Sequence, residues 1–520
     1  MVKAQTTIIP HPQEIKFIQG VFQLSKDTKI ISQKETREEA NYLAEELKKG
    51  FGEKIKIKKK GKGISLILDK SLKQDLGDEG YSLTVRQDEI KISAPTNTGI
   101  FYGIQSLRQL LPAEFEYQAN AAKSVEIPCA QVKDYPRFGW RAFMLDEARH
   151  FQGMETVKDL LDQMALLKMN VFHWHLTDDQ GWRIEIKKYP KLTEIGGFRE
   201  TTQITRNHPE DQNEIPHGGF YTQKEIKEII DYANERHIRI VPEIEMPGHA
   251  MAAITAYPWL GVLGTSKEVP GEFGKLEDSF NVADPKVYKF LEDVLNEVFA
   301  LFPGQVVHIG GDEVKFDAWK NSATMKELMK KEDLKSPADV QIYFTNRISN
   351  FIDQTGHRMM GWNEILGYNV HEWQEDSDFE VKQQLAKSAI IHFWKGDLDL
   401  IKQAASSGYD VVNSTYWNTY LDYNYEAIPL SRAYNYDPIP NGLNKKYESK
   451  ILGAGCQLWT EWVPNRKKLD QQVFPRLAAY AEVGWTNKEQ KDWERFSQSL
   501  EELKARWTLE GIDFATEVEK

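Results

Sequence analysis

The stretch QVVHIGGDE at residues 305–313 joins a short apolar run to two glycines and an acidic pair. An apolar run without polar alternation is typical of a strand buried on both faces, which is the usual state of a parallel strand. Two glycines let a ligand approach the backbone closely. The stretch therefore predicts a buried parallel strand with a polar site at its carboxyl end.

Seven further runs of this kind lie on both sides of it. They are AFMLD (142–146), NVFHWHL (170–176), IRIVPEI (238–244), RMMGWNE (358–364), AIIHFWK (389–395), YDVVNS (409–414) and ILGAGCQLW (451–459). Amphipathic helical stretches separate the runs, and such alternation predicts βα units. Eight units within residues 135–520 predict an α/β fold, a (β/α)8 TIM-type barrel with insertions.

Residues 1–134 follow another pattern and contain none of the 14 tryptophans. A helix is expected at 35–52, a hairpin turning around Gly61 and Gly63, a strand pair at 81–95 and a closing helix before Pro112. We therefore expect a small α+β N-terminal domain at 1–134 and a catalytic barrel at 135–520.

Composition excludes several classes of protein. Lys and Arg number 66 and Asp and Glu 78, and the net charge of -12 is unfavourable for nucleic-acid binding. No apolar run approaches the roughly 20 residues of a membrane span. Two cysteines, Cys129 and Cys456, are too few for a disulfide framework.

The first residues, MVKAQTTIIPHP, lack a charged region followed by an apolar one. Two localisations stay open: cytoplasmic, or periplasmic or secreted if an export signal has been removed.

Polar and aromatic residues gather where the predicted strands end, which is where active sites of such barrels lie. Tryptophan faces suit the apolar C–H faces of sugar rings, and carboxylates suit sugar hydroxyls. Glycosidic cleavage needs a protonated carboxylic acid at the leaving oxygen, and burial keeps such an acid protonated. We assign this acid to Glu313 and an orienting role to Asp312.

Seven motifs in chain order carry a resemblance to a known family. They are WRAFMLDEARHF (140–151), VFHWHLTDDQGWR (171–183), PEIEMPGHA (242–250), HIGGDE (308–313), GWNE (361–364), YLDY (420–423) and LWTEW (458–462). Together they resemble family 20 of the glycoside hydrolases, the β-N-acetylhexosaminidases. The resemblance implies an exo-acting retaining enzyme without a cofactor or metal. It would remove terminal N-acetylglucosamine, with N-acetylgalactosamine as a second candidate, from β-linked oligosaccharides or glycoconjugates.

The resemblance also implies residue roles. The substrate's 2-acetamido oxygen would be the nucleophile, Glu313 the acid and base, and Asp312 the partner of the acetamido N–H. Asp178 and His249 would support the acid. The substrate-binding residues would be Arg141, Trp362, Trp394, Tyr420, Asp422, Trp459 and Glu461. We expect Arg149, His150 and Asp179 to be structural, and the resemblance assigns no sugar contact to Glu245.

Two alternatives remain open. His173 and His175 have the spacing of paired zinc ligands and, with His249 and Asp312, would form the site of a metal-dependent amidohydrolase or deacetylase. A non-catalytic carbohydrate-binding barrel is the other alternative, and the presence of Glu313 weighs against it.

Overall fold

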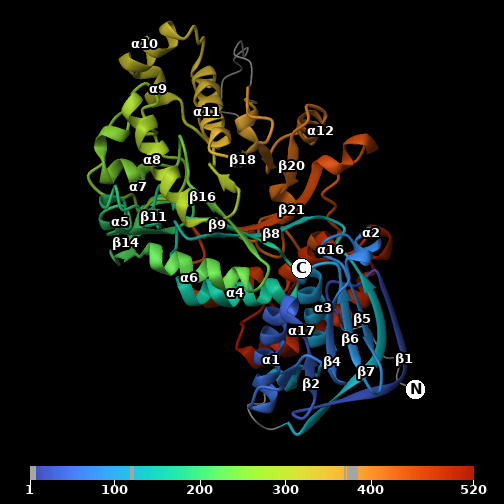
Figure 1. Ribbon diagram of the computed structural model, residues 1–520. Coiled ribbons are helices and arrows are strands. Elements are labelled where there is room, and N and C mark those ends of the chain that lie inside the picture. Colours follow the sequence, from blue (N-terminus) through green and yellow to red (C-terminus); the bar gives the residue numbers. More distant parts are fainter. Residues whose placement is uncertain (1–7, 118–121, 368–370, 372–383, 520) are drawn as a thin grey trace.

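The structure, a computed structural model, describes residues 8–117, 122–367, 371 and 384–519. An eight-stranded closed barrel forms the larger part, and a seven-stranded sheet lies beside it (Figure 1). Within the described residues, none of the helices combines the length and the apolar character that a bilayer-spanning segment requires.

The predicted barrel is confirmed, because each of the eight apolar runs contains or overlaps one strand of it. The strands are β8 (Trp140–Asp146), β9 (Val171–His175), β16 (Arg239–Glu243), β17 (Val306–His308), β18 (Arg358–Trp362), β19 (Ile390–Phe393), β20 (Asp410–Asn413) and β21 (Ile451–Leu458). All pair in parallel, and β21 closes the barrel against β8. Their carboxyl ends therefore meet on one face.

Helices cover the outside of the barrel. The main ones are α4 (Met154–Leu166), α6 (Gln223–Asn234), α8 (Pro285–Leu301), α11 (Pro337–Gln354), α12 (Asp399–Ser406) and α16 (Arg476–Trp485). Local signals fix their starts: Thr222 and Glu225 form a capping box at α6, and Asp284 caps α8 before Pro285.

The barrel interior changes character along its axis. One end is filled by apolar side chains, among them Val171, Val241 and Val306. Two residues further along the same strands, His173, Glu243 and His308 point inward and are buried. The carboxyl half of the interior is thus a polar layer beneath the strand ends.

The small domain is a twisted sheet with strand order β1 (Glu14–Ser25), β7 (Ser124–Asp134), β5 (Tyr81–Val85), β6 (Ile90–Ala94), β4 (Ile64–Leu68), β2 (Lys29–Ile31) and β3 (Lys56–Lys58). Helices α1 (Arg37–Phe51) and α3 (Asn97–Gln109) pack on it. Both helices and the β5–β6 strand pair agree with the sequence-based expectation.

The predicted hairpin around Gly61 and Gly63 is wrong. β3 and β4 do not pair with each other, because β2 lies between them and pairs in parallel with both. The lysine–isoleucine alternation correctly indicated two strands, and the glycines correctly indicated a turn between them. The two strands do not pair with each other, because α1 connects β2 to β3 as a βαβ unit and so places β3 beside β2.

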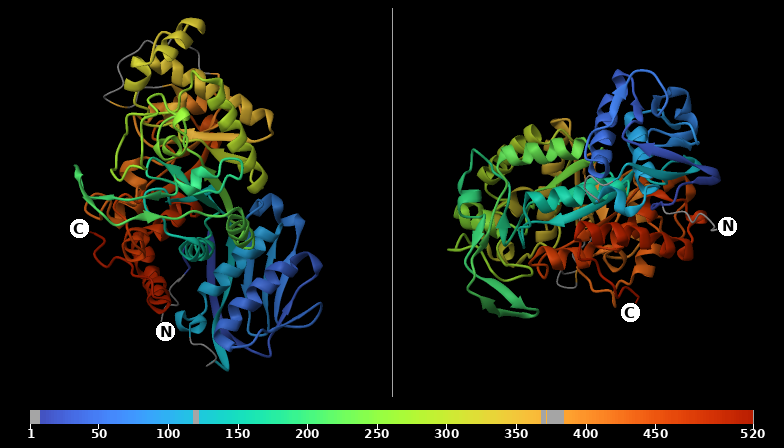
Figure 2. Two further views of the ribbon diagram at one scale, coloured as in Figure 1. Left: turned by 90° about the vertical axis from the view of Figure 1, so that its left-hand side faces the viewer. Right: turned by 90° about the horizontal axis from the view of Figure 1, so that it is seen from below.

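Two elements lie outside the regular alternation of strands and helices. The hairpin of β13 (Thr202–Thr205) and β14 (His208–Asn213) projects from the barrel in both views of Figure 2. The C-terminal helix α17 (Trp493–Glu510) packs against the small domain, where Arg506 donates to the backbone oxygens of Arg108 and Leu111.

Candidate active site

Asp312 and Glu313 follow β17 through a strained turn. Gly310 and Gly311 have φ of +65° and +95°, and Glu313, which has a side chain, has φ of +48°. A Cβ on Gly310 would lie 1.6 Å from Glu245 Oε2, so any other residue there would have to displace the Glu245 carboxyl group as well as adopt a positive φ. Strain of this kind persists where the surrounding structure imposes it, and here it fixes the acidic pair at the strand end.

The two acidic side chains have different surroundings. Asp312 is 8% exposed, and its Oδ1 has no hydrogen-bond partner among the described residues. Burial raises the pKa of Asp312 well above its ordinary value, with His249 opposing the shift. Glu313 is more open: its Oε1 lies 3.2 Å from Lys275 Nζ and its Oε2 lies 3.8 Å from His249 Nε2.

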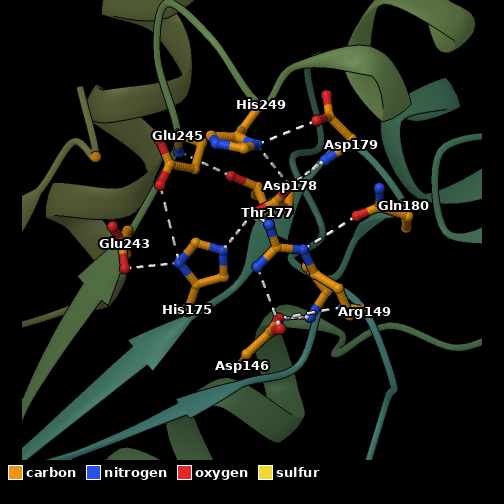
Figure 3. A network of polar contacts seen from close by, with 12 residues as sticks. Asp146, Arg149, His175, Thr177, Asp178, Asp179, Gln180, Glu243, Glu245 and His249 are labelled. Carbon is orange, nitrogen blue, oxygen red and sulfur yellow. Dashed lines mark hydrogen bonds and ion pairs between the residues drawn. The ribbon is translucent and has the colours of Figure 1, made fainter. Parts of the chain in front are cut away.

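His249 lies between the acidic pair and two buried aspartates, Asp178 and Asp179. Figure 3 shows His249 with the two aspartates. Its Nδ1 lies 3.2 Å from Asp178 Oδ1 and 3.1 Å from Asp179 Oδ2. Burial alone would lower the pKa of His249, but these carboxylates raise it well above its ordinary value. The structure thus brings Asp178 and His249 together beside Glu313, and Asp179 shares the contact.

Four aromatic rings lie together at the ends of β18, β19 and β21. The ring centroids of Trp362 and Trp459 are 5.9 Å apart, those of Trp459 and Tyr420 6.1 Å, and those of Tyr420 and Trp394 also 6.1 Å. The Tyr420 and Trp394 rings are nearly parallel, at 9°. Such an enclosure suits an apolar group attached to a polar ligand.

Carboxylates and an arginine lie next to this enclosure. Burial raises the pKa of Asp422 to about 8, Glu461 adds to the shift, and Asp422 Oδ1 has no hydrogen-bond partner among the described residues. Burial also raises the pKa of Glu461, which Arg149 opposes. The Arg149 guanidinium lies over the Trp459 ring, 5.1 Å from its centroid. Carboxyl and guanidinium groups of this kind can form hydrogen bonds with hydroxyl groups.

Arg141 is the one predicted site residue that the structure places elsewhere. It lies at the amino end of β8, and its guanidinium donates to the backbone oxygens of Phe138 and Lys168. It also pairs with Glu79 of the small domain at 2.6 Å. The assignment to a sugar-binding role was wrong, because the residue lies at the amino end of its strand and its side chain therefore contacts the opposite end of the barrel from the site.

Arg149, which lies just beyond β8, is the arginine that lies beside Trp459, although the sequence-based expectation for it is a structural role. It follows the carboxyl end of the strand, and this position was the signal that sequence reasoning missed. Glu364 was also left without a role. It accepts from Trp394 Nε1 at 3.0 Å and lies 2.8 Å from His371 Nε2, so it holds one wall of the enclosure.

The ligand set of the metal alternative is not assembled. The described residues that could hold an ion form four groups: His173 with Glu243 and His308, His175 with Asp178 and Glu245, Asp178 with Asp179 and His249, and His249 with Asp312 and Glu313. None of these groups combines His173 or His175 with both His249 and Asp312. The nitrogen–oxygen distances from His175 to Glu243 and Asp178, 2.6 and 2.9 Å, are hydrogen-bond distances. The two histidines therefore serve a hydrogen-bonded layer and do not converge with His249 and Asp312.

Fold and site together define a (β/α)8-barrel protein whose strand ends carry an adjacent Asp–Glu pair, an aromatic enclosure and a preceding α+β domain. A profile described as "Glycosyl hydrolase family 20, catalytic domain" matches residues 138–488, and one described as "Glycosyl hydrolase family 20, domain 2" matches residues 5–135. The chain belongs to glycosyl hydrolase family 20.

Relatives agree with this membership. A β-hexosaminidase of Porphyromonas gingivalis is 35% identical, over 98% of this chain and 64% of its own length. A β-hexosaminidase of Vibrio furnissii is 33% identical, over 93% of this chain and 77% of its own length. The solved exo β-N-acetylglucosaminidase of Vibrio harveyi superposes with a TM-score of 0.86 at 31% identity, over 99% of this chain and 80% of that one. The chain thus spans about two thirds to four fifths of these three proteins.

Proposed function

We propose that the protein is an exo-acting retaining β-N-acetylhexosaminidase. It would release terminal N-acetylglucosamine, with N-acetylgalactosamine as a second candidate, from the non-reducing ends of β-linked glycans. The observation that carries this is Asp312: a buried carboxyl group with an unpartnered oxygen, directly beside Glu313 and the aromatic enclosure. A buried polar group without a partner costs about 1–3 kcal/mol, and a ligand N–H would remove that cost.

The chemistry uses the substrate as its own nucleophile. Glu313 protonates the glycosidic oxygen while the 2-acetamido carbonyl oxygen attacks the anomeric carbon, and the bond to the leaving group breaks. Asp312 accepts from the acetamido N–H and stabilises the positive charge of the oxazolinium ion. Glu313 then deprotonates a water that attacks the same carbon and reopens the ring, so the β configuration is retained.

Binding is divided among the surrounding groups. Trp362, Trp394 and Trp459 would enclose the acetamido methyl group and stack on the ring, and Tyr420 would donate to the acetamido oxygen. Asp422, Glu461 and Arg149 would bind the ring hydroxyls. This assignment replaces Arg141 with Arg149, since only Arg149 lies at this end of the barrel.

The deciding experiment compares an aryl β-N-acetylglucosaminide with the matching aryl β-glucoside, both with EDTA present. Cleavage of the first alone is expected, because only it carries the 2-acetamido nucleophile. Equal cleavage of both would mean that a protein group is the nucleophile and would overturn the role of Asp312. Loss of activity in EDTA would favour the metal alternative.

Two variants test the roles directly. Glu313→Gln should lower kcat by about 10²–10⁴-fold, and less for a leaving group that needs no proton. Asp312→Asn should lower kcat by about 10²–10³-fold for every leaving group, because the charge on the oxazolinium ion loses its partner. Near wild-type turnover in either folded variant would contradict the mechanism.

A further inference from the structure

His175 lies beneath the site and bridges two carboxylates (Figure 3). Its Nδ1 lies 2.6 Å from Glu243 Oε2, and its Nε2 lies 2.9 Å from Asp178 Oδ2. The ring is fully buried. A carboxylate only accepts hydrogen bonds, and a neutral imidazole donates only one. Both contacts are satisfied together when the ring carries two N–H groups, that is, as an imidazolium.

Each carboxylate that His175 holds reaches a different part of the site. Asp178 accepts from Arg149 Nη2 at 2.8 Å and faces His249 Nδ1 at 3.2 Å. Glu243 accepts from the Trp362 indole N–H at 3.0 Å. One buried hydrogen-bond network therefore links Arg149, His249 and Trp362.

We propose that His175, as a doubly donating imidazolium, is a positioning residue that fixes Asp178 and Glu243 and through them Arg149, His249 and Trp362. The charges alternate along this network: the Glu243 carboxylate is followed by the His175 imidazolium, the Asp178 carboxylate and the Arg149 guanidinium. Burial alone would lower the pKa of His175, but Glu243 and Asp178 raise it to about 10, in agreement with this geometry. The catalytic part of the proposal rests on the proposed function.

His173 provides a matched comparison on the same strand. Its Nε2 also lies 2.8 Å from Glu243 Oε2, and it is equally buried in the same layer. Among the contacts of the described residues, Asp178 pairs with His175 and not with His173, so His173 lacks the second carboxylate partner that defines the role of His175.

The first test needs no activity. In protein labelled with ¹⁵N in its histidines, both ring nitrogens of His175 should give imidazolium shifts from about pH 5 to pH 9. The signals are assigned by their loss in His175→Gln or, if that variant does not fold, by their movement in Asp178→Asn. A neutral tautomer at pH 7 would overturn the proposal, whatever the enzyme cleaves.

The second test is the pH profile of kcat/KM. His175→Gln should lower kcat/KM by about 10- to 100-fold. It should also move the profile toward higher pH by about one unit, because the site loses a positive charge and both Asp312 and Glu313 ionise less readily. His173→Gln should leave the position of the profile unchanged. In this comparison, the charged and titratable groups that interact with Glu313 include His249, Lys275, Asp312, Glu364 and His371. Those that interact with His175 include Glu243, Asp178, Glu245, Asp146 and His308.

Failure of the His175 proposal can be distinguished from failure of the proposed function. A lower rate with an unmoved profile would mean that His175 only supports the fold, and the positioning role would fall. An inactive wild-type protein would remove the proposed function, whereas the protonation state of His175 would still be decided by the spectra.

Discussion

At the scale of single residues, β8 offers two arginines that the sequence alone does not separate by role. Arg141 and Arg149 lie at opposite ends of the strand, one bonded to the small domain and the other over Trp459. The direction of the strand thus decides which arginine can meet a sugar, since ligands of such barrels bind at the carboxyl ends.

Arg149→Lys should therefore lower kcat/KM by about 10- to 100-fold, because lysine cannot reproduce the forked contacts of a guanidinium. Arg141→Lys is the matched control: it should lower the free energy of unfolding while leaving KM of the folded enzyme unchanged. Steady-state kinetics and denaturant unfolding of both variants check this. The reverse pattern would restore Arg141 as the sugar-binding residue.

The burial of Asp312 predicts how kcat/KM depends on pH. The residue must be ionised to hold the acetamido N–H, and burial raises its pKa. The ionised fraction, and with it kcat/KM, should therefore fall as pH drops, with an inflection at higher pH than the ordinary aspartate value of about 4.

The measurement is the acid limb of kcat/KM on an aryl β-N-acetylglucosaminide. In Asp312→Asn the residual activity should lack this inflection, whereas Glu364→Gln should keep it. An inflection near pH 4 in the wild type would show that Asp312 ionises as an exposed aspartate does.

At the scale of elements, the β13–β14 hairpin supports the loop that carries Lys275. Gln203 donates its backbone N–H to Gly271 O at 2.8 Å, and its side-chain Oε1 accepts from Phe273 N at 2.8 Å. The same loop lines a pocket of about 670 Å³ next to the Lys275–Glu313 contact. We infer that this pocket receives the leaving group.

Gln203→Ala should raise KM for the β-linked disaccharide of N-acetylglucosamine about fivefold, the effect of losing one hydrogen bond of about 1 kcal/mol. Hydrolysis of N-acetylglucosaminyl fluoride, whose leaving group is too small to contact the loop, should change less than twofold. His208→Ala, at the exposed tip of the hairpin, is the control and should change neither. Equal losses on both substrates would place the effect in the sugar-binding site instead.

At the scale of the whole molecule, Asp134 joins the two parts of the chain. It accepts from Tyr81 in the small domain, from Trp485 Nε1 in α16, and pairs with Lys168 Nζ at 2.9 Å just beyond α4. Asp134 and Lys168 are fully buried. The small domain is thus anchored to the barrel at the end opposite to the site.

Asp134→Asn should lower the free energy of unfolding by about 3–5 kcal/mol, because it leaves the Lys168 charge buried without its partner. Asp88→Asn, which breaks an exposed pair with Lys62, should change it by less than about 1 kcal/mol. Denaturant unfolding followed by circular dichroism checks both. A small effect at Asp134 would mean that water reaches Lys168 and screens it.

The barrel and the position of its acidic pair could be predicted from the sequence alone. Both follow from local patterns: continuous apolar runs of strand length alternate with helices, and QVVHIGGDE places its carboxylates directly after such a run. Patterns of this kind depend on neighbours along the chain, so they can be interpreted without the fold.

Three features depend on the fold as a whole: which arginine lies beside Trp459, which strand lies between β3 and β4, and how His175 joins Glu243 to Asp178. These relations link residues that are far apart in the chain, 68 positions in the case of His175 and Glu243. Strand direction, crossover connections and the inward-facing layer of the barrel bring them together. Hydrophobic periodicity carries no information on which buried polar groups will meet, because that choice is made by hydrogen bonding inside a closed barrel.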